Sequence, residues 1–318
     1  MSTRYGYFLS SEEHPPQELV RQARLAEEAG FEALWISDHF HPWLDEQGES
    51  GHVWSVIGAI SQVTSLPITT AVTCPLIRQP PAMVAQAAAT AALLTGGRFT
   101  LGVGTGEDLN EHIMGRRWPS AGERLEMLEE AVFVIRELFT GRLVSHEGKH
   151  YTVDTARLYS VPGTPPRIYM SAFGEKAVKL AARIADGYVL VQPSADLVRL
   201  YRESGGGGRP VQGGLKVCWG PDETQARKTM HRLWRTDDVP GEAGQLLPLP
   251  RQFAQLGELV TEDMVSAPCG PDPAVHLDGI RAYREAGFDE VYVSQVGPDA
   301  EGFFDFYARQ VLPRLREG

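Results

Sequence analysis

The 318-residue sequence predicts a (β/α)8 barrel (TIM barrel) with insertions, a closed ring of parallel strands surrounded by helices. Short β-prone runs alternate with amphipathic stretches along almost the whole chain, a pattern typical of parallel α/β folds. No Gly-x-Gly-x-x-Gly segment follows the first strand, which weakens the alternative of an open doubly wound sheet. We expect a single barrel domain over residues 1–318, with a late insertion at about 204–260.

The first half of the chain predicts four strands, three helices and a hairpin. We expect strands at residues 5–9, 34–36, 68–72 and 99–103, helices at 18–29, 81–94 and 124–139, and a hairpin at 142–153. The first helix carries Leu19, Ala23 and Ala26 at the spacing of one helical face, and Gly30 suits its C-terminal end.

The second half continues the alternation of strands and helices, and one of its segments repeats a sequence pattern of the first half. Strands are expected at 168–171, 188–192 and 215–217, with a helix at 175–185. Residues 28–37 and 285–294 each predict the end of a helix, a glycine, a turn and a buried strand. Their places near opposite ends of the chain suit the second and last strands of a closed barrel. Between them, four glycines at 205–208 predict a flexible surface loop. For the proline-rich pieces that follow, a lid over the barrel and a disordered excursion both stay open as alternatives.

Composition narrows the possible partners. A net charge of -11 and a pI near 5.3 argue against a nucleic-acid partner, which needs a basic surface. The three cysteines are widely separated and odd in number, so neither a disulfide framework nor a metal site is indicated. The sequence has no signal-peptide pattern and no membrane-spanning run, so we expect a cytoplasmic protein without a membrane partner.

The segment Ser37-Asp38-His39-Phe40-His41-Pro42-Trp43 follows the second predicted strand. In parallel α/β folds the active site is built from residues at the carboxyl ends of strands. The alternative is a structural loop whose histidines only cap or pack. Asp38 and His39 followed closely by Trp43 favour an enzyme.

A second informative segment, Gly104-Thr105-Gly106-Glu107, follows the fourth predicted strand. The small residues would let a flat ring lie against the backbone, and Glu107 supplies a carboxylate that can act as an acid in a closed site. The alternative is a tight turn with a solvated glutamate. Glu12 and Thr73 likewise follow the ends of predicted strands.

Together with residues 70–75 and 102–111, these segments resemble the luciferase-like flavin and deazaflavin oxidoreductases. The closest resemblance is to the coenzyme F420-dependent glucose-6-phosphate dehydrogenase family, and it covers most of the chain except about residues 204–260. It implies a barrel enzyme that transfers a hydride between coenzyme F420 and a small molecule, and a homodimer. An FMN-dependent luciferase-like monooxygenase and a non-catalytic barrel that binds a flavin or a partner surface stay open as alternatives.

The resemblance also implies roles for individual residues. His39 would be an acid/base near the reacting hydroxyl, with Trp43 packed beside it, and Glu107 would protonate or hydrogen-bond near N1 of the ring. Glu12 matches a further active-site carboxylate. The Ala71–Val72 bond matches a non-prolyl cis peptide behind the ring. The implied cofactor contacts are Asp38, Ala71, Val72, Thr73, Gly106 and Asn110.

Two further segments bear on the cofactor tail and the substrate. The segment Phe173-Gly174-Glu175-Lys176 opens a predicted helix, whose free amides and dipole can hold a phosphate. The positions that match the family's substrate-phosphate ligands are Ser194, Glu262 and Glu301, none of them cationic. We therefore expect a neutral alcohol, ketone, imine or enone as substrate rather than glucose-6-phosphate.

Overall fold

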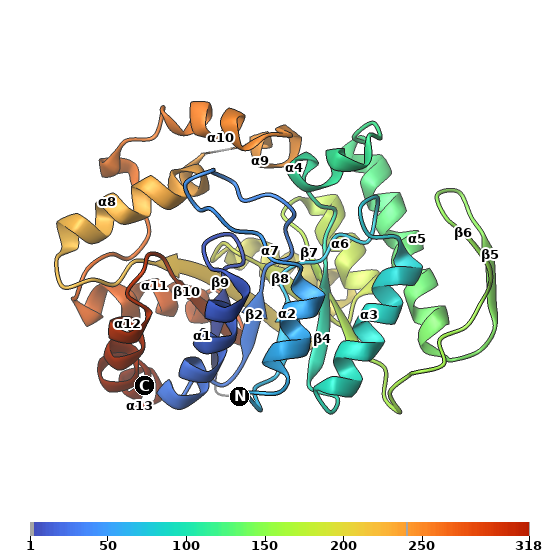
Figure 1. The fold of residues 1–318 in the computed structure, drawn as a ribbon, viewed down its shortest axis with the longest axis horizontal. Helices are drawn as coiled ribbons and strands as arrows, with labels where there is room; N and C mark the ends of the chain where they lie inside the picture. Colours follow the sequence, from blue (N-terminus) through green and yellow to red (C-terminus); the bar gives the residue numbers. More distant parts are fainter. Residues whose placement is uncertain (1–2, 240, 318) are drawn as a thin grey trace.

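In the computed structural model, which describes residues 3–239 and 241–317, eight parallel strands close into a barrel in the order β1, β10, β9, β8, β7, β4, β3, β2 (Figure 1). Residues 1, 2, 240 and 318 of the predicted domain lie outside this description. The barrel strands are β1 (Arg4–Leu9), β2 (Leu34–Ile36), β3 (Ile68–Thr70), β4 (Phe99–Val103), β7 (Arg167–Ser171), β8 (Gly187–Leu190), β9 (Val211–Val217) and β10 (Glu290–Gln295). The predicted fold class is confirmed.

The strands of the two similar segments, residues 28–37 and 285–294, flank the first strand. β1 pairs with β2 on one side and with β10 on the other, so these strands are the second and the last of the ring. Inside the barrel Trp35 stacks on Tyr292 with ring centroids 4.4 Å apart, and its Nε1 donates to Gln212 at 2.9 Å. These large side chains fill the barrel, so its interior is a packed core and no pore runs through it. Their layer closes the barrel beneath the carboxyl ends of the strands.

Helices surround the barrel and bury their apolar faces against it. They are α1 (Pro16–Ala29), α2 (Val53–Ile60), α3 (Pro81–Leu94), α5 (Ala121–Phe139), α6 (Glu175–Ile184), α7 (Ala195–Tyr201), α11 (Pro273–Glu285), α12 (Ala300–Phe306) and α13 (Leu312–Glu317). The sequence analysis missed α2, which is short and nearly all apolar, although Val53, Val56, Ile57 and Ile60 recur at helical spacing. The hairpin is confirmed as β5 (Val144–Glu147) and β6 (Thr152–Ala156), beside α5 (Figure 1).

Between β9 and α11 the chain leaves the barrel and forms a segment that we call the cap. It contains α8 (Glu223–Trp234), α9 (Ala243–Leu246) and α10 (Pro250–Gly257). Because β9 is a barrel strand that pairs with β8 and β10, this excursion begins after Val217, later than the predicted start at 204. The glycines at 205–208 are not simply a surface loop, since Gly206 is buried against the Tyr201 ring.

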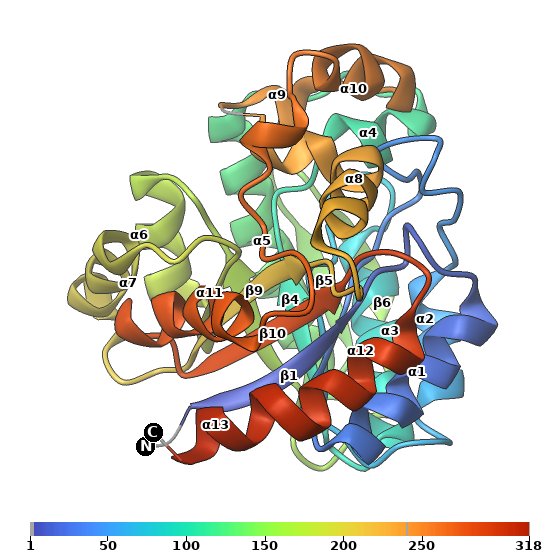
Figure 2. The same cartoon turned by 90° about the vertical axis from the view of Figure 1, so that its left-hand side faces the viewer.

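The cap lies over the carboxyl ends of the barrel strands. Figure 2 shows α8, α9, α10 and the short helix α4 (Asp108–Glu111) together above the barrel, with α13 at the opposite end. Gln47, in the loop after β2, donates to the Leu233 carbonyl of α8 at 2.8 Å. The loops that carry the predicted site are therefore covered by the cap. Within the described ranges no helix is long and apolar enough to span a membrane.

Candidate active site

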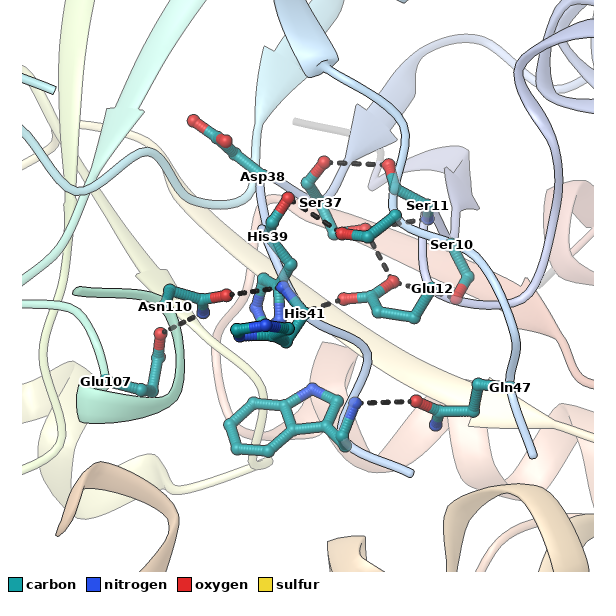
Figure 3. Close-up of polar contacts among 12 residues, drawn as sticks. Ser10, Ser11, Glu12, Ser37, Asp38, His39, His41, Gln47, Glu107 and Asn110 are labelled. Carbon is teal, nitrogen blue, oxygen red and sulfur yellow. Dashed lines mark hydrogen bonds and ion pairs between the residues drawn. The ribbon is translucent and has the colours of Figure 1, made fainter. Parts of the chain in front are cut away.

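The loop after β1 brings Glu12 to the loop after β2. The buried Glu12 carboxylate accepts hydrogen bonds from Ser37 Oγ at 2.7 Å and Ser10 Oγ at 3.0 Å (Figure 3). Ser37 Oγ in turn accepts from the Ser11 amide at 2.9 Å. These bonds fix the carboxylate in one orientation, as a site that handles protons requires.

His39 lies next to this carboxylate. Its Nδ1 is 3.5 Å from Glu12 Oε1, and this buried nitrogen makes no hydrogen bond within the part of the chain that the structure describes. The His39 ring also contacts Trp43, with centroids 5.2 Å apart. The pair has the separation at which a small shift would complete a carboxylate–imidazole hydrogen bond, which is how an acid/base histidine is oriented.

Glu107 approaches from the loop after β4. It is the N-cap residue of α4, and its Oε2 accepts from Asn110 Nδ2 at 3.3 Å. The other end of that amide, Asn110 Oδ1, accepts from the Phe40 amide at 2.8 Å and the His41 amide at 3.2 Å. Asn110 thus holds the β2 loop and Glu107 together, with Glu107 and Glu12 on opposite sides of the two histidines (Figure 3).

Asp38 is engaged by protein groups. Its Oδ2 accepts from Thr73 Oγ1 and from Gln79 Nε2, both at 2.8 Å, and its Oδ1 accepts from Arg78 Nη2 at 2.9 Å. In Figure 3 its carboxylate points away from Glu12. The side chain therefore joins the loops after β2 and β3.

A second buried carboxylate completes this network. Glu111 accepts from the amides of Ile77 at 3.1 Å and Arg78 at 2.7 Å, and its Oε1 is 3.6 Å from Arg78 Nε. Burial raises the pKa of Glu111, and the Arg78 charge and both amides oppose that effect. Arg78 therefore serves two carboxylates from two different loops.

The end of β3 forms a small-residue platform between these groups. The Ala71–Val72 peptide is cis, as the resemblance implied. Both residues pack on the aromatic layer that contains Trp35 and Tyr292. A Cβ at Gly104 would lie 2.7 Å from Val72 Cγ2, and one at Gly106, whose φ is +70°, would meet the Cys74 sulfur. Only glycine fits these two positions, so the loop after β4 can pack closely against Val72 and Cys74 at the end of β3.

The segment predicted for the cofactor tail opens α6. Gly174 is the N-cap, no side chain caps the helix, and a Cβ at this position would meet open space. Phe173 is exposed, and Glu175 pairs with Lys179 at 2.6 Å. The first-turn amides of this ten-residue helix are thus free of a side-chain cap.

The cap closes over Trp43. Its ring meets Phe253 of α10 edge-on with centroids 5.1 Å apart, and its amide donates to Gln47 Oε1 at 2.8 Å. On the β4 side Arg124 of α5 donates to Gln245 of α9 at 2.7 Å. The contact between Trp43 and Phe253 places an apolar roof beside His39, which limits water near the acid/base groups.

The structure therefore brings together Glu12, His39, Trp43, Glu107 and Asn110, with Ala71, Val72, Thr73 and Gly106 at the platform. The sequence analysis missed Ser37, Arg78 and Gln79. The signal for Arg78 was available, because two carboxylates that follow buried strands need a cationic partner. Among the described residues no cluster of histidine, cysteine, aspartate and glutamate could hold a metal ion.

A closed (β/α)8 barrel with acid/base side chains gathered at its carboxyl end defines an enzyme scaffold. The model of the luciferase-like monooxygenase family matches residues 2–290, and the chain belongs to this family.

Three similar proteins are informative. A coenzyme F420-dependent glucose-6-phosphate dehydrogenase of Microbacterium testaceum (strain StLB037) is 36% identical, over 99% of this chain and 98% of its own length. An F420-dependent hydroxymycolic acid dehydrogenase of Mycobacterium tuberculosis is 34% identical, over 98% and 88%. A solved F420-dependent secondary alcohol dehydrogenase, in complex with an F420–acetone adduct, superimposes with a TM-score of 0.92 at 30% identity, over 99% and 100%.

Proposed function

We propose that this protein is a coenzyme F420-dependent oxidoreductase that transfers a hydride between the deazaflavin and a neutral small organic substrate. The observation that carries the proposal is that Glu12 and Glu107 lie on opposite sides of His39, whose ring contacts Trp43. The full-length similarity to three F420-dependent enzymes supports the choice of cofactor.

The residues present fit the cofactor. Ala71 and Val72 present small side chains at the cis peptide, and the glycines at 104 and 106 let the loop after β4 pack closely against Val72 and Cys74. Thr73 directly follows the platform, and Asn110 joins Glu107 to the loop after β2. Residues Phe173, Gly174, Glu175 and Lys176 would hold the anionic tail at the start of α6. When bound, the deazaflavin supplies a carbon centre that accepts or gives up a hydride.

The protein's own residues manage the accompanying protons. In the oxidising direction His39 takes the hydroxyl proton of the substrate, and Glu12, fixed by Ser10 and Ser37, orients the imidazole and stabilises its charged form. Glu107, held by Asn110, would hydrogen-bond or exchange a proton with the ring beside it. Trp43 and the cap exclude water.

The substrate is proposed to be an alcohol, ketone, imine or enone without a phosphate group. Ser194 caps α7 by accepting from the Leu197 amide, and Glu301 is exposed and pairs with Arg21 at 2.9 Å. None of the side chains at Ser194, Glu262 and Glu301 is cationic, so none of them supplies a charge-assisted contact to a phosphate ester. The relatives named above act on different substrates, which agrees with specificity set by such positions.

A fluorescence titration with coenzyme F420 and with FMN tests the cofactor. We expect binding of coenzyme F420 at about micromolar Kd or tighter, near -8 kcal/mol, and markedly weaker binding of FMN. Preferential FMN binding would favour the second candidate, an FMN-dependent monooxygenase, which the description of the matching family keeps open. Binding of either without turnover of any tested substrate would favour a non-catalytic barrel.

We further infer a homodimer in the cytoplasm. Met83 and Leu94 of α3 are 59% and 47% exposed beside a groove of about 450 Å³ between α2 and α3, which a second copy of this chain would cover. All three cysteines are free, in keeping with a reducing compartment. Sedimentation of the wild type and of Met83→Glu tests the dimer, and a monomeric wild type would contradict it.

A further inference from the structure

A second carboxylate follows Glu12 directly and takes no part in the proton chemistry proposed above. Glu13 is partly buried, and one of its oxygens accepts from Trp234 Nε1 at the end of α8. The other accepts from the Gly297 amide, just after β10, at 3.1 Å. A single side chain thereby joins the loop after β1, the cap and the loop after β10.

Contacts lead from Trp234 back to the site. Trp234 is 3% exposed and belongs to an apolar cluster that includes Met230, Leu233 and Val296, and Trp43 packs against this cluster. Gln47 adds a polar link, because it donates to the Leu233 carbonyl and accepts from the Trp43 amide, both at 2.8 Å. A shift at the end of α8 would therefore displace Trp43, which contacts His39.

We propose that Glu13 is a positioning residue: its ionised carboxylate fixes the end of α8 against the barrel and thereby holds Trp43 beside the substrate. The role rests on the function proposed above. An ionised carboxylate has an acceptor for each of the two N–H donors, whereas a glutamine at this position would offer one acceptor and lose one of these bonds. Loss of one acceptor is thus expected to loosen the cap.

The surroundings place the ionisation of Glu13 near neutral pH. Burial raises the pKa of Glu13 to about 7, against the lowering effect of Trp234 and Gly297. Other charged groups face the same region. Glu12 raises the pKa, and Lys216 of β9 lowers it while lying 3.9 Å from the Trp234 ring centroid and 2.6 Å from Asp237. Tyr7 of β1 is coupled to Glu13 and stays neutral, because burial raises its pKa.

The test uses the full chain with coenzyme F420 and propan-2-ol as the probe substrate. Glu13→Gln keeps the size of the side chain but offers one acceptor. Trp234→Phe removes the donor and identifies the Trp234 indole signal in a ¹H–¹⁵N spectrum. Glu46→Gln is the matched control, because Glu46 also joins a barrel loop to the cap, through Arg235 at 3.2 Å, but at an exposed position.

In the wild type we expect the Trp234 indole signal to titrate near pH 7, as Glu13 ionises. At pH 8 KM should be about three- to tenfold higher in Glu13→Gln and in Trp234→Phe than in the wild type, with kcat within about twofold. Glu46→Gln should behave like the wild type. If one of the two site variants is recovered in low yield, the other tests the same link.

Two results would overturn the role: an indole signal that does not titrate in the wild type, or a KM of Glu13→Gln at pH 8 that matches that of the wild type. Failure of the proposed function looks different. A wild type that neither binds coenzyme F420 nor turns over the alcohol removes the catalytic role, while the indole titration still reports whether Glu13 holds Trp234.

Discussion

Arg78 Nη2 lies 2.9 Å from Asp38 Oδ1, in a pair whose side chains are 11% and 2% exposed. Arg78 also approaches the buried Glu111, so one guanidinium balances two carboxylates under the platform. Breaking a buried ion pair from one side leaves an uncompensated charge, which is far more harmful than losing a surface pair.

Arg78→Ala should therefore lower the free energy of unfolding by about 3–5 kcal/mol. Arg117→Ala is the control, because its pair with Glu123 is exposed and should contribute less than about 1 kcal/mol. Chemical denaturation of both variants measures the difference. Equal, small losses would mean that the two carboxylates do not depend on Arg78.

Much of the barrel was predictable because its signals are local. β2, β4 and α3 have the predicted bounds, since their apolar runs end at turn-forming residues. β3 ends two residues earlier than predicted, at Thr70. The site residues could be located because strand ends converge in a parallel barrel. The pairing of Asp38 with Arg78, and of Glu13 with Trp234, depends on distant segments and has no local signal.

Glu107→Gln and His39→Ala should each lower turnover by about 10²–10⁴-fold, the usual scale for losing a general acid or base. Cofactor affinity should change little, because both groups serve charge that develops during the reaction. Steady-state kinetics with propan-2-ol and fluorescence titration of coenzyme F420 measure the two effects. Near-normal turnover in Glu107→Gln would show that Glu107 is only the N-cap of α4.

Asp38→Ala is expected to weaken the cofactor first. The structure supplies the reason, because the Asp38 carboxylate holds Thr73 and the loop after β3 that carries the platform. The matched variant Thr73→Val, which keeps the shape but removes the donor, should weaken coenzyme F420 in the same direction by a smaller factor. Unchanged affinity in both variants would separate the platform from this network.

Glucose-6-phosphate should not bleach the deazaflavin at a useful rate, whereas a neutral secondary alcohol should. Each missing charge-assisted contact to phosphate is worth about 1.5–3 kcal/mol, and three such positions lack a cation. Stopped-flow absorbance with both compounds at equal concentration decides between them. Rapid bleaching by the sugar phosphate would show that other cations of the chain reach the substrate.

Glu13→Gln should stabilise the folded chain at pH 8 and have little effect at pH 5. The sign follows from the raised pKa of Glu13, which burial moves from 4.5 to about 7. A carboxyl group with a raised folded-state pKa contributes most at low pH, and that contribution is lost as pH rises from about 4.5 to about 7. Above that window the wild type holds a charge that its surroundings disfavour by about 3 kcal/mol, and the neutral glutamine removes it.

Thermal unfolding of both proteins at the two pH values measures the difference, with Glu46→Gln as the control. A variant that is less stable than the wild type at pH 8 would mean that the bonds to Trp234 and Gly297 outweigh the desolvation of the carboxylate. The expected result would instead show a residue that lowers stability at neutral pH while it holds Trp43 in place for the reaction.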